Sequence, residues 1–94
     1  MNLFDGKQVY GQGSWQVKNE RPMDAEELSM INRAEVVSSD YGLSVCFFLK
    51  AGGQVYVPLS RDSKLTAGDT LDAKSAKVLT LHREGSDDIE RIIE

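Results

Sequence analysis

The chain has 94 residues, of which 40% are hydrophobic and 28% are charged, and this composition is typical of an ordinary globular domain. Its single cysteine excludes an internal disulfide and a thiolate metal cluster, and no apolar run approaches the roughly 20 residues that cross a bilayer. No basic segment followed by an apolar stretch begins the sequence, so we expect one cytoplasmic domain, residues 1–94, without a signal peptide.

Charge is distributed unevenly along the chain. The net charge is −4 overall, but it is −3 over residues 1–42, +3 over residues 43–83 and −4 over residues 84–94. The overall acidity argues against non-specific binding of polyanions. A basic central segment beside an acidic end is compatible with a local nucleic-acid surface, and a mixed solvated surface is the alternative explanation.

The first 30 residues predict an N-terminal arm and one short helix. Glycines interrupt residues 1–22, where we expect only short strands near Gln8–Tyr10 and Ser14–Val17. Asp24 can cap a helix, and Glu27 stands three residues later, as in a capping box. A helix is therefore expected near residues 24–30.

The most informative stretch is residues 43–59, where two runs of alternating apolar residues flank a glycine-rich turn and predict a β-hairpin. A three-residue turn, Ala51–Gly53, brings the two apolar sets onto one face. It pairs Leu49 with Val55, Phe47 with Val57 and Val45 with Leu59. The opposite face then carries Phe48 and Tyr56 as direct cross-strand neighbours.

Short strands separated by Gly and Asp turns continue to the end of the chain. The expected strands are Ile31–Ser39, Leu43–Lys50, Gln54–Leu59, Thr70–Asp72, Lys77–Arg83 and Asp88–Ile93. This pattern predicts a mainly β fold, a small antiparallel barrel of five to six strands over residues 31–93, on which residues 1–30 pack. An oligonucleotide/oligosaccharide-binding (OB-like) barrel fits the longer strands, and an SH3-like barrel fits nearly as well.

Catalytic chemistry has little support in the sequence. Cys46 and His82 could meet across adjacent strands, but a buried thiol and a surface imidazole are the simpler explanation. Asp62, Asp69 and Asp72 lack the spacing of a calcium loop, and the two glycines at 52–53 lack the lysine and helix of a phosphate loop. We therefore expect no enzyme activity, no cofactor and no metal.

A binding face is the remaining functional candidate. Proteins that hold single-stranded nucleic acid combine stacking aromatic rings with cations along the backbone. Phe48 and Tyr56 could form such a platform, with Tyr41 near one end. The flanking cations would be Lys50, Arg61, Lys64, Lys74 and Lys77.

Two alternatives compete with this platform. The N-terminal segment, with Tyr10, Trp15 and the helix, could pack over the two rings and make them a second small core. The chain could instead be a structural or protein-interaction factor, such as an accessory subunit or a self-associating protein, that pairs through a strand edge.

Four segments of the chain resemble a group of known sequences. They are Ser39-Asp-Tyr-Gly-Leu-Ser-Val-Cys-Phe-Phe48, Tyr56-Val-Pro-Leu-Ser60, Gly68-Asp69 and Asp88-Ile-Glu-Arg91. Over roughly residues 15–93 the chain resembles uncharacterised small proteins of gut Bacteroides and of their phages or mobile elements. The resemblance implies no activity and no site residues. It implies a phage or mobile-element setting, in which small barrels that bind single-stranded DNA are frequent.

Overall fold

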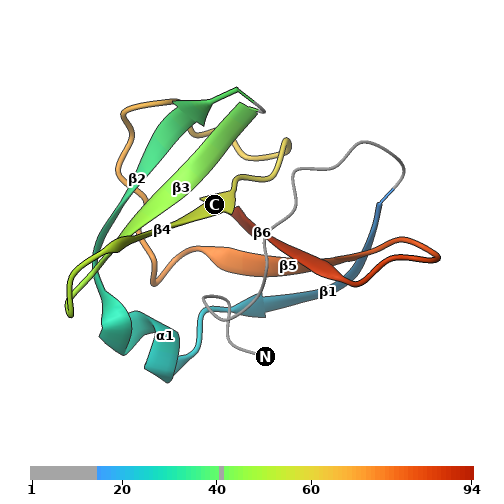
Figure 1. Ribbon diagram of the computed structural model, residues 1–94, viewed down its shortest axis with the longest axis horizontal. Helices are drawn as coiled ribbons and strands as arrows, with labels where there is room; N and C mark the ends of the chain where they lie inside the picture. Colours follow the sequence, from blue (N-terminus) through green and yellow to red (C-terminus); the bar gives the residue numbers. More distant parts are fainter. Residues whose placement is uncertain (1–14, 41) are drawn as a thin grey trace.

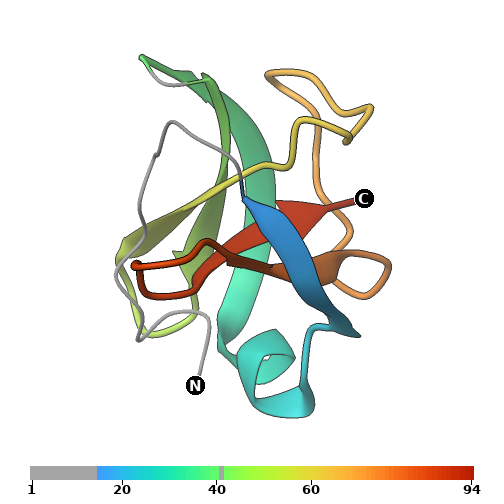
Figure 2. The ribbon, with the colours of Figure 1, turned by 90° about the vertical axis from the view of Figure 1, so that its right-hand side faces the viewer.

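The computed structural model describes residues 15–40 and 42–94, which form two three-stranded antiparallel sheets and one short helix (Figure 1). One sheet has the strand order β1-β5-β6 and the other has the order β2-β3-β4. The elements are β1 Gln16–Pro22, α1 Ala25–Met30, β2 Ile31–Ser39, β3 Gly42–Leu49, β4 Gln54–Pro58, β5 Lys77–His82 and β6 Ile89–Ile93. Figures 1 and 2 show the β2-β3-β4 sheet lying over the β1-β5-β6 sheet, with α1 at one end of β2.

Helix α1 confirms the prediction of a short helix with a capping box. The Asp24 carboxylate accepts a hydrogen bond from the Glu27 backbone N–H at 2.8 Å, and the Glu27 carboxylate accepts one from the Asp24 backbone N–H at 2.9 Å. These two hydrogen bonds satisfy two of the backbone N–H groups that have no partner within the helix. The helix ends where Ile31 adopts extended backbone and begins β2.

The strands from Ile31 onward lie within one residue of their predicted bounds, except for Thr70–Asp72. That segment forms only a single bridge, between Thr70 and Glu35 on the outer edge of β2. A bulge follows Ile31, so that Ile31 and Ala34 both face the core although they are three positions apart, a spacing that places residues of a regular strand on opposite faces. The predicted strand near Gln8–Tyr10 lies outside the described residues.

The β3–β4 hairpin has the predicted turn length but not the predicted register. The Leu49 N–H donates to the Gly53 carbonyl at 3.1 Å, so the three turn residues are 50–52. Phe47 pairs with Val55 and Val45 pairs with Val57, and the predicted pairs are therefore wrong. Because the register differs by two residues, every side chain still lies on the predicted face.

The predicted barrel is wrong, in its OB-like and its SH3-like form, because the two sheets do not close into one. The segment Gln16–Pro22, expected to be largely irregular, is a full strand that takes the free edge of β5. Between the sheets the only bridge among the described residues joins Leu59 and Ile92. A barrel needs a continuous ladder around its circumference, and a single bridge does not supply one.

The core lies between the inner faces of the two sheets. Phe47, Val57 and Ile92 are among its fully buried side chains, and Leu28 of α1 packs against it. The core consists of Met23, Ile31, Ala34, Val36, Val45, Phe47, Val57, Leu59, Leu71, Ala76, Val78 and Ile92. Within residues 15–40 and 42–94, no helix has the length and apolar character needed to span a bilayer.

Candidate functional site

The face of the β2-β3-β4 sheet that points away from the core, here called the aromatic face, carries both predicted rings. The register places its side chains in three rows across the strands. The rows are Arg33–Phe48–Gln54, Glu35–Cys46–Tyr56 and Val37–Ser44–Pro58. Phe48 and Tyr56 are therefore diagonal neighbours, and the expectation that they lie directly opposite each other is wrong.

Phe48 is half-buried, and an arginine stacks on it. The Arg33 guanidinium lies 3.8 Å from the centroid of the Phe48 ring, which is the geometry of a cation–π contact. Arg33 also forms an ion pair with Glu35, two residues along β2. The sequence signal for this stack was the placement of Arg33 and Glu35 on the polar face of a strand whose other face carries Ala34 and Val36.

Tyr56 is the exposed ring of the aromatic face, with 49% of its surface accessible. Its hydroxyl donates to the Gln54 side-chain oxygen at 2.9 Å, which orients the phenol along β4. A hydrogen bond with the Cys46 thiol raises the pKa of Tyr56. Cys46, which stands in the same row, is buried.

The described part of the N-terminal segment does not cover the two rings. Trp15 packs on a second apolar cluster, formed by Leu79, Leu81 and Ile89 of the other sheet. Helix α1 packs against the main core through Leu28. Tyr10 and Tyr41 lie outside the described residues.

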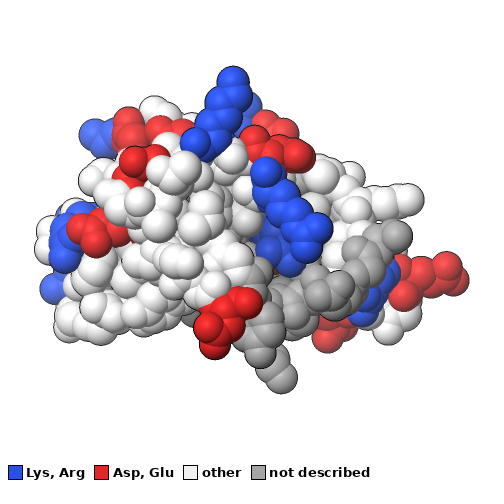
Figure 3. Space-filling view, turned by 90° about the horizontal axis from the view of Figure 1, so that it is seen from above, with Lys and Arg blue, Asp and Glu red and all other residues white. Residues whose placement is uncertain are grey.

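The predicted cations do not gather around the rings. Lys50 follows Phe48 closely, in the β3–β4 turn, whereas Lys77 belongs to β5 and its ammonium pairs with Glu20 at 2.9 Å. The other three are exposed in the connection between β4 and β5, and they are Arg61, Lys64 and Lys74. Figure 3 shows basic and acidic side chains interspersed over the described part of one face, without a continuous positive patch.

Groups that could carry catalysis are also separated. Cys46 is buried in β3, whereas His82 is exposed at the end of β5 in the other sheet. His82 Nδ1 lies 2.8 Å from an Asp88 oxygen, and the Lys18 ammonium donates to the other oxygen at 3.0 Å. The hydrogen bond with His82 and then that with Lys18 lower the pKa of Asp88. Within the described ranges, no three His, Cys, Asp or Glu side chains cluster closely enough to hold a metal.

One pocket, of about 610 Å³, lies beside the turn between β5 and β6. Arg83 stacks over the Trp15 ring at 4.5 Å and donates to the Ser86 hydroxyl at 3.2 Å. Gln16 pairs with His82, and this pairing brings Trp15 beside Arg83, a contact that sequence reasoning missed because β1 was not expected to reach β5. The lining residues are Trp15, Arg83, Gly85, Ser86, Asp87, Asp88 and Ile89.

Comparison with known proteins found no match. No family model, no curated protein and no solved structure matches it. The argument about function therefore depends on the residues and on their geometry.

Proposed function

We propose that the chain is a non-enzymatic binding domain that holds single-stranded nucleic acid against the aromatic face. The observation that carries the proposal is the stack of Arg33 on Phe48, beside the half-exposed ring of Tyr56. Accessible rings combined with cations are the means by which sequence-tolerant single-strand binders hold their ligand. We also propose a cytoplasmic location, in keeping with the free thiol of Cys46.

The two rings have different roles in this proposal. A base stacks on Tyr56, whose ring is accessible, and such a stack contributes about 1–3 kcal/mol. Phe48 supports the Arg33 guanidinium, which offers a flat cationic surface to a second base or to a phosphate. Lys50 lies in the turn after β3 and adds a second cation.

Glu35 and the net charge of −4 limit the strength of this binding. A carboxylate beside Arg33 offsets part of its attraction for phosphate, and the acidic surface repels long polyanions. We therefore expect moderate affinity, because few phosphates are neutralised. The affinity should fall as salt is added, because the contacts with phosphate are electrostatic. Single strands should bind better than duplex, since a duplex keeps its bases stacked on each other.

The alternative, in which a protein partner pairs with a strand edge, has weaker support. β1 is an exposed edge strand, but it carries a bulge at Lys18, further charges at Glu20 and Arg21, and Pro22 at its end. These features are the ones by which proteins prevent edge pairing. The outer edge of β2 already bonds to residues 68–71, with the Val36 N–H donating to the Asp69 carbonyl at 2.8 Å.

Fluorescence anisotropy with a labelled thymidine oligonucleotide tests the proposal. We expect binding at about 50 mM salt that weakens clearly at about 200 mM. Tyr56→Ala should weaken it about 5- to 150-fold, which is the loss of one stacked base, while Tyr56→Phe keeps the ring and most of the affinity.

Val17→Ala, at an exposed site on β1, is the matched control and should change nothing. Circular dichroism must show that each variant is folded. Absence of binding at low salt, or equal affinity of the parent chain and Tyr56→Ala, would refute the proposal.

A further inference from the structure

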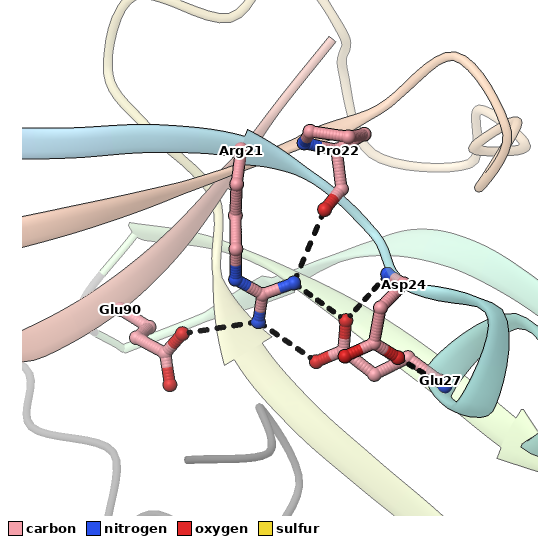
Figure 4. Close-up of polar contacts among 5 residues, drawn as sticks. All are labelled: Arg21, Pro22, Asp24, Glu27 and Glu90. Atoms are coloured by element: carbon pink, nitrogen blue, oxygen red, sulfur yellow. Dashed lines mark hydrogen bonds and ion pairs between the residues drawn. The ribbon is translucent and has the colours of Figure 1, made fainter.

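Three charged side chains, Arg21, Glu27 and Glu90, meet where β1, α1 and β6 converge, and we call them the buried charge cluster (Figure 4). Arg21 donates from Nη1 to Glu27 Oε1 at 2.7 Å and from Nη2 to Glu27 Oε2 at 3.0 Å. Arg21 Nη1 also donates to the Pro22 carbonyl at 3.1 Å. Glu27 is completely buried, so this two-pronged pair neutralises a carboxylate that has no access to water.

Glu90 approaches the same guanidinium but is poorly satisfied. Its Oε2 lies 3.5 Å from Arg21 Nη2, which is too long for a good hydrogen bond. Its Oε1 is buried and has no hydrogen-bond partner among the described residues, and the residue as a whole is only 9% exposed. A buried polar atom without a partner is rare in folded proteins and needs an explanation.

Among the described residues, the cluster sets one guanidinium against two carboxylates when both glutamates are ionised. Arg21 is already committed to Glu27 through two hydrogen bonds. Asp24, the N-cap residue of α1, is another carboxylate, and it is occupied in capping the helix. Ionised Glu90 would therefore be a nearly dry carboxylate that shares a cation with Glu27, and this arrangement is costly.

We propose that Glu90 is a proton-binding site, which keeps its proton in mildly acidic solution where an exposed glutamate has lost it. Release of the proton leaves two carboxylates competing for Arg21. The buried charge cluster thereby makes the stability of the junction between β1, β6 and α1 sensitive to pH.

The surroundings of Glu90 agree with this assignment. Burial raises the pKa of Glu90, Arg21 on β1 lowers it, the Glu27 charge on α1 raises it and the charge of the N-terminal amino group lowers it, with a net upward shift. The folded state then holds the proton of Glu90 more tightly than the unfolded state does. Protonation of Glu90 therefore contributes its full amount to the free energy of unfolding at low pH. This contribution is lost as the pH rises through the folded-state pKa.

Carbon-13 NMR of the side-chain carboxyl groups in the intact chain tests the proposal directly. The reference is the ordinary glutamate pKa of 4.5. We expect the titration midpoint of Glu90 to lie above this value. A Glu90 midpoint at or below 4.5 would overturn the proposal.

A variant gives a second, independent readout. Glu90→Gln imitates the protonated side chain, so it should remove the fall in Tm that the parent chain shows as the pH rises above the ordinary glutamate value of 4.5. Glu26→Gln is the control and should keep that fall. Parallel pH profiles of the parent chain and Glu90→Gln would contradict the proposal. If Glu90→Gln does not fold, the titration of the parent chain decides alone.

Discussion

Two arginine–glutamate pairs of the same chemistry lie in opposite surroundings in this protein. Arg33 and Glu35 lie on the aromatic face, with side chains 52% and 40% exposed, whereas Arg21 and Glu27 are 26% and 0% exposed. In the first pair water screens the charges, and the arginine remains available to a ligand. In the second the pair is a structural connection between β1 and α1. Burial therefore separates the residues that we assign to binding from those that hold the fold together.

The largest expected effect comes from removing the buried arginine, Arg21, and the matched change at Arg33 should have little effect. Arg21→Met removes the guanidinium that pairs with the buried carboxylate of Glu27, which should cost about 3–5 kcal/mol of unfolding free energy. Arg33→Met removes an exposed pair and should cost less than about 1 kcal/mol. Urea denaturation monitored by circular dichroism measures both. Similar costs for the two variants would invalidate the comparison.

Neighbouring phenylalanines allow a sharper comparison of the two faces of one strand. Phe47 is fully buried in the core, so Phe47→Ala should cost about 3–5 kcal/mol. Phe48 is half-buried under Arg33, so Phe48→Ala should cost clearly less while weakening oligonucleotide binding. The two measurements are chemical denaturation and anisotropy. If Phe48→Ala unfolds the chain as Phe47→Ala does, Phe48 belongs to a core and not to a binding face.

The smallest expected effect concerns Asp88, which stands two residues before Glu90 and whose pKa is shifted in the opposite direction. Its pKa is lowered, so its contribution to stability is present above its ordinary value of 3.8 and is lost as the pH falls through the folded-state pKa. Asp88→Asn should therefore flatten the acid side of the Tm profile. Lys18→Gln should do the same to a smaller extent, because His82 is the stronger partner. An acid limb that is unchanged in both variants would contradict this assignment.

The sequence was most informative where the cause of structure is local. The capping box of Asp24 and Glu27 fixes α1, and the alternation of apolar residues fixes β2 to β6 and their faces. Gly52 and Gly53 both have positive φ and mark the position of the turn. Because either glycine can take a turn position, the sequence does not decide between two strand registers that differ by two residues.

The sequence was least informative where structure depends on distant pairing. Residues 16–22 are mostly polar and exposed, and they lack the alternation of apolar and polar residues that predicts a strand. The pairing of β1 with β5 could therefore not be foreseen. The barrel prediction failed for this reason. In the candidate site the shared face of Phe48 and Tyr56 followed from side-chain parity. The position of the Arg33 guanidinium on the Phe48 ring could not be predicted in this way, because Arg33 belongs to β2 and stands fifteen positions earlier in the chain.

Amide NMR of the labelled chain, titrated with a short thymidine oligonucleotide, tests the central claim most directly. We expect the largest shifts at Arg33, at Cys46–Phe48 and at Gln54–Tyr56, with salt reversing them. Shifts concentrated at Trp15 and Arg83, beside the β5–β6 turn, or no shifts at all would contradict the assignment of the aromatic face as the binding surface.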